Sequence, residues 1–177
     1  MEDIYYKKII KEAEAGTPDA QFQLGKMYYY GRGVTQNYVK AREWYEKAAE
    51  QGFAEAQYKL GFMYFHTFSL MQNYKIKALE WFKKAAEQEH TGAQYDLGVM
   101  HYYGYGVARD YIKALGWYEK AAAQGYAQAQ YNLGNMYYMG LGVSQDFTKA
   151  KEWYKRACDN GFKPGCGKYK DLNDQGY

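Results

Sequence analysis

The sequence predicts an all-α solenoid in which four helical hairpins stand between two capping helices. Three observations lead to this prediction: a fixed repeat period, apolar residues at helical spacing within each repeat, and glycine turns between the helices. Successive tryptophans lie 37, 36 and 36 residues apart, at Trp44, Trp81, Trp117 and Trp153. A period of this length is characteristic of stacked helical repeats.

We therefore divide the 177 residues into one solenoid domain without linkers. Its parts are an N-terminal capping helix at 1–18, repeats at 19–53, 54–90, 91–126 and 127–162, and a C-terminal cap at 163–177. The N-terminal helix, at residues 3–15, resembles the second helix of a repeat, because Ala13 and Gly16 occupy the positions of Ala49 and Gly52. Residues 163–172 are expected to form a shortened closing helix.

The first helix of each repeat, here called helix A, opens with alanine, glutamine, an aromatic residue, a variable residue, leucine and glycine, as in Ala20 to Gly25. Ala20, Leu24, Met27 and Tyr28 recur at i, i+4, i+7 and i+8 and so form one buried face of a helix. Gly25 lies beside this face. We expect its missing side chain to let a second helix approach closely, which outweighs a cost of about 1 kcal/mol in helix propensity.

The second helix, here called helix B, follows a turn such as the Gly-Arg-Gly-Val segment at 31–34, where glycine supplies the positive φ that ends helix A. A polar side chain is expected to cap the start of helix B, at Asn37, Asp110 and Asp146. The helix repeats the pattern Lys-Ala-x-x-Trp-Tyr-x-Lys-Ala-Ala. Gly52 is expected to cap its C-terminus.

The second repeat departs from the others wherever the chain turns. Thr67 and Ser69 replace the two loop glycines, one residue is inserted near Lys75, and Glu89 stands at the capping-glycine position. A left-handed conformation costs a residue other than glycine about 1 kcal/mol. We therefore expect the chain to follow a different path at this turn.

The loop of the second repeat also carries three apolar residues, Phe68, Leu70 and Met71. One interpretation is an exposed apolar loop that contacts a partner, since exposed apolar patches often mark contact sites. The other is that the loop folds back and covers the hairpin that has lost its glycines. The sequence leaves both open.

The paired signatures AxxxLGxxYxxGxGV and KAxxWYxKAAxxGxAxA occur four times in register, with His101 in place of the tyrosine in the third repeat. In these residues the chain resembles the Sel1-like repeat (SLR) family, relatives of the tetratricopeptide repeats with a slightly longer period. The resemblance implies a right-handed α-α superhelix that serves as a scaffold or adaptor for protein complexes and is widespread in bacteria. It implies no particular ligand.

The two cysteines, Cys158 and Cys166, lie eight positions apart in the terminal hairpin, where they face each other. They are either two independent buried thiols or a disulfide, and we predict the disulfide. Cysteine-rich members of the SLR family are similar here. A disulfide favours a periplasmic or secreted location, whereas the charged residues 1–10 favour the cytoplasm as the alternative.

The inventory of nucleophiles and ligands predicts no enzyme, no metal site and no cofactor. Neither Ser69 nor Ser144 begins a Ser-x-x-Lys motif, and His66, His90 and His101 have no second ligand at helical spacing. The resemblance leaves one alternative, because some cysteine-rich SLR proteins carry a β-lactamase or penicillin-binding label. A hydrolase of that type is therefore the second hypothesis for function.

The distribution of charge and of apolar residues limits the kinds of partner that we expect this chain to bind. The net charge of +3 comes from 23 basic and 20 acidic residues that are scattered along the chain, so we expect no nucleic-acid partner. No apolar run approaches the roughly 20 residues of a membrane span. We expect a monomer that binds a protein or peptide.

The predicted partner-binding residues lie on helix A, opposite its buried face. Counting the opening alanine as position one, these are positions three, seven and ten; three and ten are aromatic in every repeat, while seven varies. They are Phe22, Lys26, Tyr29, Tyr58, Phe62, Phe65, Tyr95, Val99, Tyr102, Tyr131, Asn135 and Tyr138. The alternative is that the rings serve only to pack neighbouring A helices together.

Overall fold

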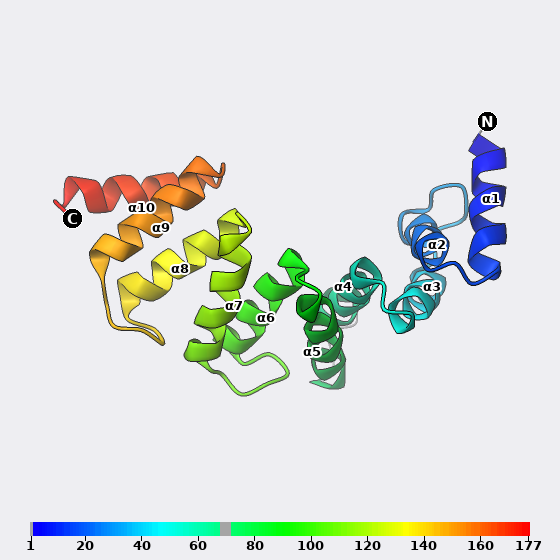
Figure 1. The fold of residues 1–177 in the computed structure, drawn as a ribbon, viewed down its shortest axis with the longest axis horizontal. Coiled ribbons are helices and arrows are strands. Elements are labelled where there is room, and N and C mark those ends of the chain that lie inside the picture. Colours follow the sequence, from blue (N-terminus) through cyan, green and yellow to red (C-terminus); the bar gives the residue numbers. More distant parts are fainter. Residues whose placement is uncertain (1, 68–71) are drawn as a thin grey trace. The chain divides into compact units, whose positions relative to one another are not determined.

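A computed structural model describes residues 2–67 and 72–177, and these residues form helices joined by short turns, without a strand (Figure 1). Phe68, Ser69, Leu70 and Met71 lie outside the described residues, so both interpretations of their loop stay predictions. The elements are α1 (Glu2–Glu14), α2 (Pro18–Tyr30), α3 (Tyr38–Glu50), α4 (Ala54–Phe62), the π-helix η1 (Met63–Thr67), α5 (Gln72–Glu87), α6 (Thr91–Tyr103), α7 (Tyr111–Ala123), α8 (Ala127–Met139), α9 (Phe147–Asp159) and α10 (Lys163–Asp174).

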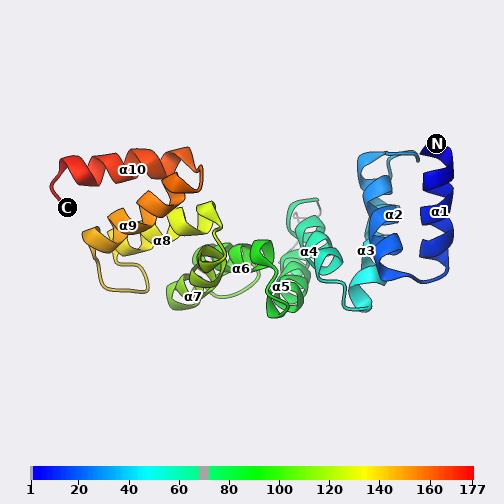
Figure 2. The ribbon, with the colours of Figure 1, turned by 45° about the horizontal axis from the view of Figure 1, so that its top comes forward.

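The all-helical prediction is confirmed: the A helices are α2, α4, α6 and α8, and the B helices are α3, α5, α7 and α9. The chain forms two compact units, 1–90 and 91–177. The first unit holds the capping helix α1 and two repeats, and the second holds two repeats and the closing helix α10. Figures 1 and 2 both show α1 alongside α2, and α10 alongside α9.

Close approach of helices A and B depends on the glycine at position six of helix A. A Cβ atom added to Gly25 would lie 2.6 Å from Cδ1 of Tyr45, and one added to Gly98 would lie 2.5 Å from Cδ1 of Tyr118. Gly134 and Tyr154 form the same pair in the last repeat. The predicted reason for this glycine, close helix packing, is confirmed.

The predicted N-caps of the B helices are also confirmed. The Oδ1 atoms of Asn37, Asp110 and Asp146 accept hydrogen bonds from the backbone N–H groups three residues later, at 3.0, 3.0 and 2.9 Å. Each cap satisfies a backbone donor that the helix itself leaves without a partner. The start of every such B helix is thereby fixed relative to the turn before it.

At the other end of helix B, the prediction of a different path at Glu89 is wrong. Glu89 has φ 63°, in the left-handed region, just as Gly52 has φ 87° in the first repeat. The backbone bonds are equivalent as well, because the N–H groups of Glu89 and His90 donate to Ala86 and Ala85 as those of Gly52 and Phe53 donate to Ala49 and Ala48. Contacts of the following residue, described below, offset the strain.

The place of the inserted residue stays a prediction, because residues 68–71 lie outside the described residues. Helix α5 runs without interruption from Gln72 through Trp81. A π-helix at Met63–Thr67 ends helix A of this repeat. The second repeat therefore ends helix A with a π-helical turn, whereas α2 and α8 end at Gly31 and Gly140.

Buried glutamines join one repeat to the next. In the first unit, Nε2 of Gln57 donates to the carbonyl oxygen of Ala49 at 3.1 Å, and Nε2 of Gln88 donates to Oε1 of Gln57 at 2.8 Å. The second unit has the same arrangement, with Gln130 bonded to Ala122 and Asn160 bonded to Gln130. These bonds satisfy polar groups inside the stack and so fix how successive helices sit.

The closing helix α10 is tied to α9 by a disulfide between Cys158 and Cys166. Gly165 lets the two helices meet, because a Cβ atom there would lie 2.8 Å from the carbonyl oxygen of Tyr154. Leu172, which is fully buried, provides the apolar contact of this helix. Helix α10 thus covers the last repeat, although it buries few apolar side chains itself.

Candidate functional site

The aromatic residues at position three of the A helices lie deeper than predicted. Phe22 is only 5% exposed, and its ring centroid lies 5.6 Å from that of Tyr45 and 5.3 Å from that of Phe53. Phe22 is therefore a core residue and does not belong on a binding surface, which corrects the prediction for this position. The helical spacing predicts that Phe22 lies opposite the leucine face. It does not show that Tyr45 and Phe53 pack against the ring.

The other position-three rings, Tyr58, Tyr95 and Tyr131, are half-buried. Each packs against the residue that precedes the next helix A: the centroid distances are 4.3 Å for Tyr58 and His90, 4.9 Å for Tyr95 and Tyr126, and 5.2 Å for Tyr131 and Phe162. These contacts lie between consecutive helices of the stack. For position three, packing accounts for the aromatic residue.

Position ten is more open. Tyr29 packs edge-on against Tyr30 and Tyr38, with centroid distances of 4.9 and 5.2 Å. In the second unit Tyr102 makes the same contacts with Tyr103 and Tyr111, at 4.8 and 5.3 Å. The other two position-ten residues also contact aromatic rings. Half-buried Phe65 lies near Phe82, and exposed Tyr138 packs against Phe147.

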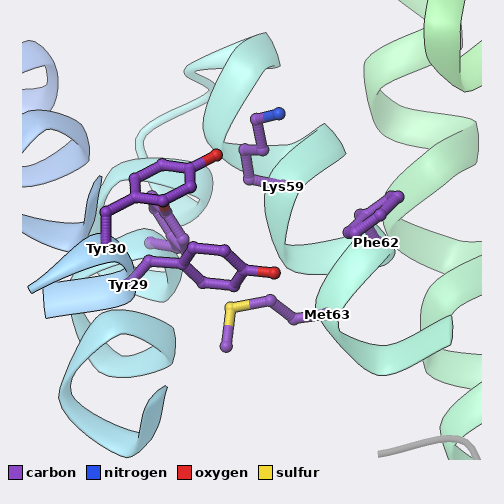
Figure 3. Close-up of a pocket in the computed structure, with 6 residues that line it drawn as sticks. Tyr29, Tyr30, Lys59, Phe62 and Met63 are labelled. Carbon is purple, nitrogen blue, oxygen red and sulfur yellow. The ribbon is translucent and has the colours of Figure 1, made fainter. Parts of the chain in front are cut away.

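A pocket opens between α2 and α4 in the first unit, with a volume of about 260 Å³. Figure 3 shows Tyr29 and Tyr30 projecting from α2 toward α4, with their hydroxyl groups facing the side that carries Lys59 and Met63. We call this the α2–α4 pocket. Its lining consists of Tyr29, Tyr30, Tyr45, Lys59, Phe62 and Met63.

The second unit has a pocket at the equivalent positions, between α6 and α8, with a volume of about 50 Å³. We call it the α6–α8 pocket. The sequence positions match one for one, since Tyr102 and Tyr103 replace the α2 tyrosines and Tyr118 replaces the buried tyrosine of helix B. Asn132 and Asn135 stand where the first unit has Lys59 and Phe62.

The capping helix creates a third version, the α1–α2 pocket, of about 270 Å³. Here Ile9 of α1 takes the place of the helix B tyrosine, while Gln23 and Lys26 take the places of Lys59 and Phe62. The lining consists of Tyr5, Tyr6, Ile9, Gln23, Lys26, Met27, Tyr30 and Arg32. Positions four and seven of helix A thus line a pocket three times in the described part of the chain, twice between two A helices and once between the capping helix and α2.

The two pockets between A helices share tyrosines at positions ten and eleven and the buried helix B tyrosine, and all three pockets differ at positions four and seven. Position four of helix A carries Gln23, Lys59 or Asn132, and position seven carries Lys26, Phe62 or Asn135. Position four was missing from the predicted set, as were the position-eleven tyrosines, Tyr30 and Tyr103. The sequence did carry a signal for position four, since it varies within an otherwise repeated segment.

The remaining predicted residue, Val99, is half-buried and packs against the core of the second unit. Asn135 accepts a hydrogen bond from the hydroxyl group of Tyr154 at 2.7 Å. Of the predicted set, five line the pockets: Lys26, Tyr29, Phe62, Tyr102 and Asn135.

The buried tyrosines at the base of the pockets are neutral groups. Burial raises the pKa of Tyr45 well above its ordinary value of 10.0, and the neighbouring Tyr30 and Tyr29 raise it further. Burial likewise raises the pKa of Tyr118, with Tyr95 as the next cause. Their hydroxyl groups can therefore donate or accept a hydrogen bond but carry no charge.

Two lysines lie over position-three rings at the pocket mouths. Nζ of Lys26 is 5.4 Å from the ring centroid of Phe22, and Nζ of Lys59 is 5.3 Å from that of Tyr58. Both distances fall within the range of a cation–π contact. Each ring thus makes a favourable contact with the ammonium group of a lysine that lines a pocket.

Catalytic and ligand groups are sparse in the described part of the chain. Ser144 lies exposed in the turn before α9, and Ser69 lies outside the described residues. Within residues 2–67 and 72–177, no three His, Cys, Asp or Glu side chains come together as a metal site. None of the helices described there is both long enough and apolar enough to span a membrane.

Several solved structures are similar to this chain. One is c5321, a protective antigen of uropathogenic Escherichia coli strains that displays an SLR fold, with 35% identity, a TM-score of 0.91 and coverage of 97% of this chain. Another is a Sel1 repeat protein from Oxalobacter formigenes, with 37% identity, a TM-score of 0.83 and coverage of 90% of this chain. The match to cysteine-rich protein B of Helicobacter pylori has 25% identity and a TM-score of 0.59, and covers 75% of this chain and 94% of that protein.

The chain spans only 36% of the c5321 structure and 65% of the Oxalobacter protein. The family model described as Sel1 repeat matches residues 18–53, 54–90, 91–126 and 127–162, which together make up most of the chain. The chain therefore belongs to the Sel1 repeat family, whose members generally serve as protein-interaction scaffolds.

Proposed function

We propose that this chain is a scaffold that binds a partner protein or peptide through the pockets between successive A helices. The proposal is carried by a pocket that positions four and seven of helix A line three times, twice between A helices and once beside the capping helix. The two pockets between A helices share three tyrosines, while positions four and seven change from one pocket to the next. A repeated frame with variable lining is how solenoid proteins build extended recognition surfaces.

The chemistry of the lining supports protein binding. Tyrosine combines an apolar ring with a hydroxyl group that can hydrogen-bond, and it is enriched among the residues that dominate interface energies. Tyr30 and Tyr103 are 50% and 59% exposed, so each pocket offers a ring to a ligand without disturbing the core. Side chains of a bound segment would enter the pockets, and its backbone would lie across the A helices.

We also propose that the chain works in an oxidising compartment. The disulfide between Cys158 and Cys166 supports this, since such bonds persist in periplasmic and secreted proteins and are rare in the cytosol. A partner would then be sought outside the cytoplasm. The compartment is tested by the oxidation state of the two cysteines in protein taken directly from the source cells.

The binding surface can be tested by photo-crosslinking in the source cells. A benzophenone amino acid at Tyr30 or Tyr103 should trap the same partner, which is then purified and its affinity for the unmodified chain measured. Matched control positions are Glu80 and Glu119, which are exposed on the B helices. A partner trapped equally well from Glu80 and Glu119, with the same affinity for pocket variants as for the native chain, would place the site on the other face.

A further inference from the structure

The first unit carries two pockets that adjoin each other, because Tyr30 lines both the α1–α2 and the α2–α4 pocket. Three cationic side chains also line them. Lys26 and Arg32 belong to the α1–α2 pocket and Lys59 to the α2–α4 pocket. The equivalent α6–α8 pocket of the second unit is lined instead by tyrosines and two asparagines.

The three cations are held by rings and not by carboxylates. The guanidinium of Arg32 lies 5.2 Å from the ring centroid of Tyr30, and the two lysines lie over Phe22 and Tyr58 as described above. Among the described residues, no carboxylate comes within ion-pair distance of these three groups. By contrast, Lys113 and Lys149 at the starts of B helices each face their capping aspartate, at 3.5 and 3.9 Å.

The carboxylate of Glu55 interacts electrostatically with Lys59 and Lys26, but it already forms a hydrogen bond with another residue. Its Oε2 lies 2.9 Å from Nε2 of His90. This hydrogen bond is the main reason that the pKa of Glu55 is lowered, with smaller contributions from Lys59 and Lys26. The positive charge at the pocket mouths is therefore available to a ligand.

Both pockets also have apolar side chains in their lining. Phe62 and Met63 line the α2–α4 pocket, and Ile9 and Met27 line the α1–α2 pocket. Volumes of about 260 and 270 Å³ lie below the roughly 300 to 1,000 Å³ of typical small-molecule sites. Each pocket therefore suits individual side chains of a peptide.

We infer that the paired pockets of the first unit bind an acidic peptide segment. In this arrangement one carboxylate lies against Lys59 and the hydroxyl group of Tyr30. An apolar side chain beside it packs on Phe62 and Met63, and a second carboxylate lies between Lys26 and Arg32. The inference rests on the proposed peptide-binding function and adds the chemistry of the ligand, from charge complementarity at a site whose cations are not neutralised within the chain.

The test is a selection of random dodecapeptides on the full chain, followed by anisotropy measurements with fluorescently labelled copies of the selected peptides. The selected peptides should contain Asp or Glu on either side of an apolar residue. Lys59→Glu and Lys26→Glu should each weaken binding about tenfold, as expected for the loss of a charged contact of about 1.4 kcal/mol. Lys59→Gln, which removes the charge without reversing it, should lower the affinity by a smaller factor.

The matched control is Lys47→Glu, a charge reversal on α3 whose ammonium lies 3.9 Å from the ring centroid of Trp44, away from the pockets. It should leave binding within about twofold of the native chain, because exposed charges at a distance are screened by salt. Circular dichroism of each variant establishes that the helices are intact.

Four results would overturn the inference. If the selected peptides are neutral or basic and do not bind Phe62→Ala, the ligand is not acidic, but the proposed function is retained. Acidic peptides that bind Lys59→Glu and the native chain equally would place the contact elsewhere. A labelled oligothymidylate that displaces the peptide and loses affinity in Lys59→Glu would identify nucleic acid as the occupant. Selection of no binding peptide at all would overturn both proposals.

Discussion

The imidazole of His90 lies flat on the ring of Tyr58, with the ring centroids 4.3 Å apart and the planes inclined by 25°. The other repeats have Phe53, Tyr126 or Phe162 at this position. His90 adds a hydrogen bond between its Nε2 and Oε2 of Glu55. The second repeat thus combines a stacking contact with an ionisable pair at one turn.

This pair should make part of the stability depend on pH. The His90 contact lowers the pKa of Glu55 from its ordinary value of 4.5, so ionised Glu55 stabilises the fold above pH 4.5. That contribution is lost as the pH falls through the lowered value. Glu55→Gln should therefore reduce the free energy of unfolding by about 0.5 kcal/mol at neutral pH, the size typical of a half-exposed pair, and by progressively less in acid.

His90→Phe is the matched control, because Phe53 and Phe162 show that phenylalanine fits this position. It keeps the ring contact with Tyr58 and removes the hydrogen bond. Urea unfolding at several pH values measures both variants. A difference between the native chain and Glu55→Gln that grows as the pH falls below 4.5 would contradict this account of the pair.

The glycine at position six of helix A gives a second prediction. A methyl group at Gly98 would lie 2.5 Å from Cδ1 of Tyr118, so Gly98→Ala should lower the free energy of unfolding by about 1 to 3 kcal/mol through overpacking. Gly116→Ala is the control in helix α7, where nothing lies within 4 Å of the added atom. It should stabilise the chain by roughly 0.5 to 1 kcal/mol, because alanine is the better helix former. Similar thermal shifts of the same sign for both variants would show that close packing is not the reason for Gly98.

The left-handed turn at Glu89 leads to a reciprocal pair of substitutions. Glu89→Gly should stabilise the chain by up to about 1 kcal/mol, because φ 63° strains a residue with a Cβ atom. Gly125→Ala, at the equivalent position of the third repeat with φ 83° and open space around it, should destabilise by about the same amount. Melting temperatures of the two variants check this, and a Glu89→Gly variant that melts well below the native chain would mean that the glutamate side chain itself stabilises the turn.

The disulfide should stabilise the closing helix. Protein purified without reductant should show no alkylatable thiol by intact mass. Replacing both Cys158 and Cys166 by serine should lower the free energy of unfolding by roughly 2 to 3 kcal/mol, because the cross-link restricts a short loop in the unfolded chain. Two alkylated cysteines in the unreduced protein would remove both the bond and the support for an oxidising compartment.

Much of the fold could be predicted because the same sequence pattern occurs in all four repeats. The caps at Asn37, Asp110 and Asp146 and the packing role of Gly25 depend on local chemistry, which the spacing of residues carries. The turn at Glu89 could not be predicted from local preference. Its strain is offset by the stacking and hydrogen bonding of the next residue, and these are contacts with another helix.

The site was predicted only in part for a related reason. A helical wheel places Phe22 opposite the leucine face, but the depth of its burial depends on how helix B and the following turn close around it. Tyr30 and Lys59 were missed because a pocket between two A helices depends on the angle at which they stack. That angle cannot be derived from the sequence pattern of a single helix.

The last prediction concerns the binding face of the second unit. Once a partner has been identified, Tyr103→Ala should weaken its binding at least about fivefold, the effect of losing about 1 kcal/mol at an aromatic contact residue. Because Tyr103 is 59% exposed, its removal should leave the core intact. Tyr102→Ala should weaken binding further but also lower the melting temperature, since its ring packs on Tyr111 at 5.3 Å. Glu119→Ala, on the exposed face of α7, is the control and should change the affinity by less than about twofold, as do most residues outside a hot spot. Isothermal titration calorimetry with the purified partner measures all three, and circular dichroism checks the helices. Equal losses from Tyr103→Ala and Glu119→Ala in folded protein would mean that the partner does not use the pocket between α6 and α8.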